Sequence, residues 1–139
     1  MSGRKALSMR ALFDTNIIID VLRNNIELDS KFLEAGAGIN TITLAELYCG
    51  VEKSQNKEKS RTKLNDLIED FDLEIVDFGS SASIVFGKLK SLLEVKGNRL
   101  DDMDLLIAST AIAEGKTLVS NNLKHFERIK NLIVVASSL

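Results

Sequence analysis

The sequence predicts an α/β fold with a central parallel sheet of about four to five strands and helices on both faces. Short apolar runs that fit strands alternate along the chain with longer segments whose apolar residues recur at helical spacing, an order typical of strand–helix units. The apolar runs lack any alternation with polar residues, which indicates strands covered on both faces. A length of 139 residues allows one domain with its own core.

The expected strands are all short. They cover 10–13, 39–42, 73–78, 117–119 and 133–135. Because the first strand begins directly after Met9, we interpret residues 1–8 as an N-terminal extension and residues 9–139 as the folded domain.

The expected helices end where residues favour a break in the chain. They cover 16–24, 28–35, 43–51, 58–71, 80–96, 102–114 and a helical turn at 123–128. Asn24 and Asn25 end the first helix, and Gly36 and Gly38 interrupt the chain after the second. Single glycines follow the two long helices in the second half of the chain.

The helix expected at 43–51 has the pattern of a capping box. Thr43 would cap it, and Glu46 stands three residues further on. Its apolar stripe is predicted to include Tyr48. The single cysteine, Cys49, excludes an intrachain disulfide, fits a reducing compartment and is expected to be a small buried side chain.

Composition and charge limit the classes of function. The net charge is −2 and the isoelectric point is about 5.5, which disfavours a protein that coats nucleic acid nonspecifically but not an enzyme with a local binding patch. No apolar run approaches the ~20 residues of a membrane-spanning helix, and the N-terminus lacks the apolar core of a secretory signal. We therefore expect a cytoplasmic protein without membrane contact.

Asp14 stands between two apolar runs, Ala11 to Phe13 and Ile17 to Ile19. An isolated buried carboxylate is costly, so Asp14 must be exposed, paired, protonated or bound to a cation. At the end of a parallel strand, its side chain would reach the crevice in which such sheets bind ligands. The sequence equally allows a simpler role, in which Asp14 caps the following helix.

Two further carboxylates are candidates for the same crevice. Glu46 lies away from the apolar stripe of its helix, although it could be only a capping-box glutamate. Asp104 is followed at helical spacing by Ile107, Ala108 and Ala111. A carboxylate at the head of such an apolar stripe should be half-buried at a helix N-terminus, where the helix dipole compensates only part of the cost of burial.

Converging carboxylates would take up a proton or bind a metal ion, because each pair at ~5 Å repels by ~3 kcal/mol at an effective dielectric constant near 20. Oxygen ligands favour Mg²⁺, with Mn²⁺ as an alternative, over zinc. The lone His125 and the lone Cys49 also disfavour a zinc site. Carboxylate-bound Mg²⁺ is typical of phosphodiester cleavage, in which it activates a water.

Four motifs, in their order and spacing, resemble the PIN-domain ribonucleases, and in particular the VapC-type toxins of toxin–antitoxin pairs. The motifs are FDTNIIID at 13–20, TLAELYCG at 43–50, DDMDLLIASTAIAEGKTLVSNN at 101–122 and HFERI at 125–129. The resemblance covers essentially residues 9–135. It implies a single PIN-like domain that hydrolyses RNA with a metal-activated water.

The resemblance assigns roles to individual residues. Asp14, Glu46 and Asp104 match the metal-binding and catalytic acids of the family. Thr15 and Asn16 match the polar pair that supports the first aspartate. The neighbouring acids of the third motif, at positions 101 and 102, do not match and are expected to be exposed.

Two positions depart from the pattern of many relatives. Asn122 falls where many have a fourth acid, and we expect it to contact the metal through its carbonyl oxygen or to orient a water. His125 stands before Phe126, where many relatives have Asp or Glu. We therefore expect one well-bound ion in the absence of substrate.

The resemblance also implies a homodimer, a cognate antitoxin, and structured RNA such as tRNA or rRNA as the substrate. Two groups of basic residues could form an RNA surface, although both would also fit solvated helix faces. They are Lys53, Lys57, Lys59, Arg61 and Lys63, and then Lys124, His125, Arg128 and Lys130.

The alternative function is a catalytically weak or inactive PIN-like module that binds RNA or protein, and the departures at Asn122 and His125 motivate it. Other α/β enzymes fit the sequence less well. There is no Gly-rich phosphate loop, and the second acid of a haloacid-dehalogenase-type phosphatase is replaced by Asn16.

Overall fold

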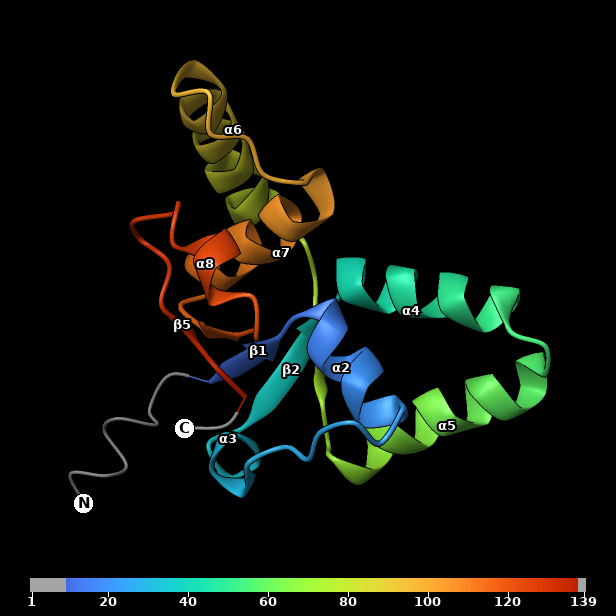
Figure 1. Cartoon of the computed structure of the whole chain (residues 1–139). Helices are drawn as coiled ribbons and strands as arrows, with labels where there is room; N and C mark the ends of the chain where they lie inside the picture. The colour runs from blue at the N-terminus through green and yellow to red at the C-terminus, as the bar shows by residue number, and fades with distance from the viewer. Residues whose placement is uncertain (1–9, 138–139) are drawn as a thin grey trace.

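The computed structural model describes residues 10–137 and confirms one α/β domain on a parallel sheet (Figure 1). The predicted extension at 1–8 lies outside the described residues. The strands are β1 (Ala11–Phe13), β2 (Ala37–Asn40), β3 (Glu74–Val76), β4 (Thr117–Val119) and β5 (Val134–Val135). They pair in the order β3-β2-β1-β4-β5, and each pair is parallel. The order reverses at β1, and such a switch point is where open parallel sheets bind ligands.

Helices cover both faces of the sheet, as predicted. They are α2 (Thr15–Leu22), α3 (Ser30–Glu34), α4 (Thr41–Lys53), α5 (Lys57–Asp70), α6 (Ser80–Val95), α7 (Asp102–Ala113) and α8 (Leu123–Phe126). In β1, Phe13 packs in the core formed with α2 to α5, and its neighbour Leu12 packs in the core formed with α6 to α8. Within residues 10–137, no helix is long and apolar enough to cross a membrane.

The prediction was wrong where the second strand meets its helix. The strand ends at Asn40 and α4 begins at Thr41, so Ile42 belongs to the helix. Asn40 is the N-cap, because its Oδ1 accepts the backbone N–H of Ile42 at 3.1 Å. Thr43 is buried inside the first turn and does not cap. The strong preference of asparagine for N-caps outweighs the strand preference of isoleucine here.

Asn40 also fixes the position of α7. Its side chain is fully buried, and its Nδ2 donates to the carbonyl oxygen of Val76 at 2.9 Å and to Thr110 Oγ1 at 3.1 Å. One amide therefore joins the ends of β2 and β3 to the start of α4 and to the middle of α7. This places the N-terminal turn of α7 beside the end of the sheet that carries Asp14.

Helices α4 and α5 form an antiparallel pair that projects from the domain (Figure 1). Only a narrow stripe of α4 is buried, made by Thr43, Leu47 and Val51. Tyr48 is 42% exposed and Cys49 is exposed, so both were wrongly predicted to be packed. The reason is that α4 has no sheet beneath most of its length.

Gly38 was predicted to interrupt the chain but lies inside β2. A Cβ atom there would stand 2.6 Å from the backbone oxygen of Glu74, so glycine allows β3 to approach. Gly36 does follow its helix with a positive φ of +90°, which glycine adopts without strain.

Replacing Gly38 by Ala should lower the free energy of unfolding by about 1–3 kcal/mol, because the contact is with backbone that cannot rotate away. The matched control is Gly87→Ala in α6, where an added Cβ meets nothing within 4 Å. It should raise stability by roughly 0.5–1 kcal/mol. Urea denaturation measures both values, and a neutral effect of Gly38→Ala would contradict the close strand approach.

Candidate active site

A cavity of about 610 Å³ gathers the three predicted acids. Asp14 comes from the end of β1, Glu46 from α4 and Asp104 from the first turn of α7. Lys53 and the half-exposed Met103 line the same cavity. The three carboxylates therefore line one cavity, although the first and the last are 90 positions apart in the sequence.

Asp14 caps a helix and also lines the cavity, so the two positions that the sequence allowed for it are compatible. Its side chain is the N-cap of α2 and accepts the backbone N–H of Ile17 at 3.0 Å. Its backbone N–H donates to the carbonyl oxygen of Val119 in β4 at 3.1 Å. The residue is only 4% exposed, yet it lines the cavity. The cap holds the carboxylate at the switch point of the sheet.

Burial raises the pKa of the Asp14 carboxyl above its usual value of 3.8, and this is the largest effect. Hydrogen bonds from the Ser120 hydroxyl and from the Ile17 N–H lower the pKa, and the negative charges of Asp104 and Asp20 raise it further. The site therefore holds a carboxylate that would be stabilised by a nearby positive charge.

Glu46 is held by the residue that follows Asp14. Thr15 Oγ1 donates to Glu46 Oε1 at 2.6 Å, and the hydroxyl of Thr43 lies 3.1 Å from that of Thr15. Thr15 was expected to support Asp14, but its side chain bonds to Thr43 and Glu46 on α4. The capping-box role of Glu46 is also wrong, because α4 begins at Thr41 and is capped by Asn40.

Asp104 is half-buried in the first turn of α7, as predicted. Its Oδ2 lies 2.9 Å from Nε2 of His125 in α8. The neighbouring acids Asp101 and Asp102 are exposed, also as predicted. The sequence showed that His125 departs from the pattern of many relatives, but it gave no indication of the contact with Asp104.

Asn122 is not brought into the cavity lining. It is exposed, and its backbone N–H donates to Ser120 Oγ at 3.0 Å. Its predicted contact with a metal ion stays a prediction. The buried hydroxyl of Ser120, at the end of β4, is the polar group from this segment that acts on Asp14.

The acids do not form a ready-made cluster of metal ligands. Within residues 10–137, no three or more histidine, cysteine, aspartate or glutamate side chains lie close enough together to hold an ion at once. A hard divalent cation that keeps most of its water needs only one or two carboxylates. Asp14 and Asp104 fit such an ion by charge, since the negative charge of Asp104 raises the pKa of Asp14, and Glu46 lines the same cavity.

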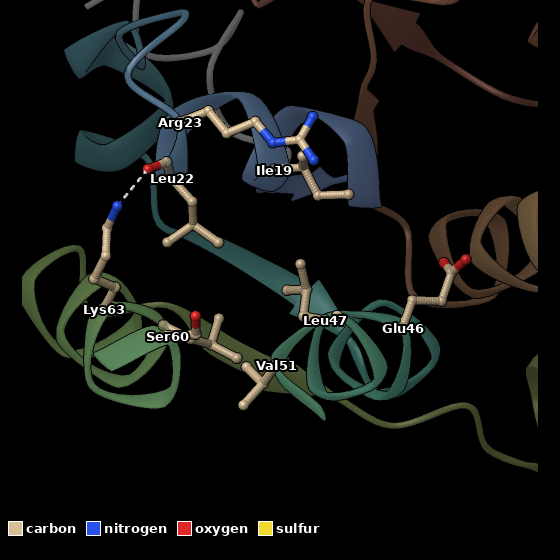
Figure 2. Close-up of a pocket in the computed structure, with 10 residues that line it drawn as sticks. Ile19, Leu22, Arg23, Glu46, Leu47, Val51, Ser60 and Lys63 are labelled. Carbon is tan, nitrogen blue, oxygen red and sulfur yellow. Dashed lines mark hydrogen bonds between the residues drawn. The ribbon is translucent and has the colours of Figure 1, made fainter. Parts of the chain in front are cut away.

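A second hollow, an apolar groove of about 260 Å³, adjoins the cavity (Figure 2). Leu22 of α2 faces Leu47 and Val51 of α4 across it, and the Nζ of Lys63 closes one end by donating to the carbonyl oxygen of Leu22 at 3.0 Å. Glu46 lies at the other end (Figure 2) and lines both hollows.

Comparisons with known proteins agree on one family. The sequence model of the PIN domain matches residues 11–132. The chain is 44% identical over 130 residues to Ribonuclease VapC2 of Rickettsia felis, which covers 88% of this chain and 94% of the relative. It is 32% identical over 127 residues to the tRNA(fMet)-specific endonuclease VapC of Salmonella typhimurium, which covers 89% of this chain and 95% of the relative.

A solved structure agrees with these sequence matches. The crystal structure of VapBC2 from Rickettsia felis, bound to a DNA fragment from their promoter, matches with a TM-score of 0.82 and 39% identity. The match covers 92% of this chain and 98% of that one. The predicted resemblance is confirmed.

Replacing Asp14 by Asn should stabilise the protein in the absence of metal at pH 7, by on the order of 1 kcal/mol, because it removes a buried charge and keeps an N-cap residue. The pKa of Asp14 is raised in the folded state, so the native carboxyl loses stability relative to the unfolded chain as pH rises above 3.8. The gain from Asp14→Asn should therefore shrink as pH falls towards 4.

Thermal unfolding in EDTA at pH 7 and at pH 4 measures this difference. The control is Asp29→Asn, which alters another aspartate N-cap, on α3, whose side chain is 35% exposed. It should change stability by less than about 0.5 kcal/mol. An Asp14→Asn variant that is less stable than the wild type at pH 7 would contradict the buried charge as a cost to folding.

Proposed function

The chain belongs to the PIN-domain family, and on this basis we propose that it is a VapC-type endoribonuclease, the toxin of a toxin–antitoxin pair. It hydrolyses phosphodiester bonds of RNA. The observation that carries the proposal is the buried Asp14 carboxylate with its raised pKa, which shares a cavity with Glu46 and Asp104 at the switch point of the sheet. A buried acid beside like charges is typical of a functional site.

We propose Mg²⁺, with Mn²⁺ as an alternative, as the metal ion. Asp14 and Asp104 would hold it, and the rest of its shell would be water. When bound, the ion supplies an activated water and stabilises the charge that develops on the phosphate. Glu46 Oε1 is held by Thr15, which leaves Oε2 to accept a hydrogen bond from the attacking water and orient it towards phosphorus.

Lys53 is the residue best placed to bind the RNA backbone. It lies in the last turn of α4, is exposed and lines the acidic cavity. In the part of the chain that the structure describes, Lys53 makes no salt bridge, whereas Lys57 and Arg61 both pair with Glu52, at 3.3 and 3.2 Å. Its ammonium group is therefore available to a phosphate next to the scissile bond.

We propose an antitoxin as the protein partner, because the structural relative from Rickettsia felis is a VapBC2 complex. The apolar groove between α2, α4 and α5 suits a partner segment with apolar side chains. Since Glu46 lines both the groove and the acidic cavity, a segment bound in the groove would reach the acids. The homodimer and the cytoplasmic location stay predictions.

Replacing Asp104 by Asn should lower the rate of RNA cleavage by at least about 100-fold in the presence of Mg²⁺, because a ligand for the ion loses its charge. Asp101→Asn is the matched control, since Asp101 is exposed in the same segment and its side chain makes no capping bond. It should leave the rate unchanged. Cleavage of structured RNA, followed on gels, measures both.

The same assay distinguishes the proposed enzyme from a non-catalytic module. Full activity of Asp104→Asn would contradict the assignment of this acid. Binding of tRNA or rRNA by the wild type, without cleavage in either Mg²⁺ or Mn²⁺, would favour an inactive RNA-binding module.

Replacing Lys53 by Ala should weaken RNA binding and reduce the slope of log affinity against log salt concentration by about 1, because one phosphate contact is lost. Lys57→Ala, the control, removes a lysine that is engaged by Glu52 and should leave the slope unchanged. Fluorescence anisotropy at several salt concentrations measures both. Equal slopes for wild type and Lys53→Ala would place the RNA elsewhere.

A further inference from the structure

The contact between His125 and Asp104 joins two residues that are 21 positions apart in the sequence and lie in different helices. His125 lies in the short helix α8, after the fourth strand, and Asp104 lies in the first turn of α7. Among the hydrogen bonds of the described residues, the Asp104 side chain is engaged through Oδ2 alone, by His125 Nε2 at 2.9 Å. The other oxygen, Oδ1, has no protein partner in that set.

The fold holds the imidazole in this place by its neighbours on α8. Phe126, the next residue, is 1% exposed and packs in the same core as Leu105 and Ile107 of α7. Just after α8, the Arg128 guanidinium donates to the carbonyl oxygen of Arg99, which precedes α7. Two anchors therefore tie α8 to the start of α7.

The imidazole itself has little freedom to move. Its side chain is 23% exposed, and its ring meets that of Phe126 edge to face with centroids 5.4 Å apart. Burial and this ring contact restrict the imidazole, so it can impose an orientation on its partner.

In this hydrogen bond the histidine is the donor and the aspartate is the acceptor. An ionised carboxylate only accepts hydrogen bonds, so the imidazole donates its Nε2–H to Asp104 Oδ2. A donor that engages one oxygen of a ligating carboxylate fixes its rotation and presents the other oxygen to the ion. Such supporting groups around metal ligands typically contribute 10- to 100-fold in metal affinity.

We propose that His125 is a positioning residue, which orients Asp104 so that Oδ1 is the oxygen presented to a divalent cation. The inference rests on the proposed metal-dependent function. Many relatives have an acid at the position of His125. In this proposal the histidine acts through Asp104 and is not itself a metal ligand. The ring nitrogen that faces Asp104, Nε2, is already used in this contact.

The test compares variants that keep or lose a donor at the position of Nε2. His125→Gln places an amide NH₂ near that position, whereas the shorter His125→Asn does not reach Asp104. Lys124→Ala, on the exposed neighbouring residue of α8, is the control. Calorimetric titration of each full-length protein with Mn²⁺ alone gives the dissociation constants, and thermal unfolding reports the fold.

Wild type and Lys124→Ala should bind Mn²⁺ equally, and His125→Gln should bind within about threefold of them. His125→Asn should bind about 10- to 100-fold more weakly. If Asn at this position lowers the melting temperature strongly, His125→Phe, which keeps the edge contact with Phe126 and lacks a donor, should show the same loss.

Three results would overturn the inference. Wild-type affinity in both His125→Asn and His125→Phe would show that the contact does not orient Asp104. A His125→Gln variant as weak as His125→Asn would mean that the imidazole itself is needed, as a metal ligand would be. Absence of Mn²⁺ binding by the wild type would overturn the metal site and this inference together, whereas the first two results leave the proposed nuclease intact.

Discussion

The buried carboxylate of Asp14 is the constraint around which the carboxyl edge of the sheet is organised. Folding places a negative charge at the end of the central strand, in a position that is 4% exposed. The cost is reduced because the carboxylate caps α2, where the N-terminal N–H groups and the helix dipole favour a negative charge, and because the Ser120 hydroxyl contacts it. These contacts lower the cost but do not cancel it, since the pKa stays raised.

The neighbouring strand β2 also ends in a residue that caps the next helix, but that residue is uncharged. Asn40 ends β2 and caps α4 as Asp14 ends β1 and caps α2. The asparagine amide has a donor as well as an acceptor, so Asn40 also bonds Val76 and Thr110 and is fully satisfied. A neutral side chain at one strand end therefore holds the scaffold together. The charged side chain of Asp14, at the end of β1, keeps an unfavourable electrostatic energy that a bound cation would reduce.

Local patterns in the sequence were sufficient for the architecture, and together with the resemblance to the PIN-domain family they selected three acids that line one cavity. The parallel sheet followed from apolar runs without alternation, and Asp104 was placed half-buried from the apolar stripe below it. The α4 boundary was missed because Thr43 and Glu46 have the spacing of a capping box, whereas Asn40 fell inside the expected strand 39–42 and is in fact the last residue of β2. Contacts between distant segments, such as Thr15 with Glu46 and His125 with Asp104, leave no periodic signal, because a hydroxyl or an imidazole can serve many partners.

Those two distant contacts also explain how a fold can keep three acids in one cavity. A compact triad would repel itself by ~3 kcal/mol for each pair at ~5 Å. In this protein Thr15 of α2 donates to Glu46 of α4, and His125 of α8 contacts Asp104 of α7. Each of these two acids thus has a side-chain donor, and the more deeply buried Asp14 keeps a raised pKa despite its own hydrogen bonds. This arrangement suits a hydrated cation that needs few protein ligands. The affinity of the site for such a cation depends on the residues that orient the acids as much as on the acids themselves.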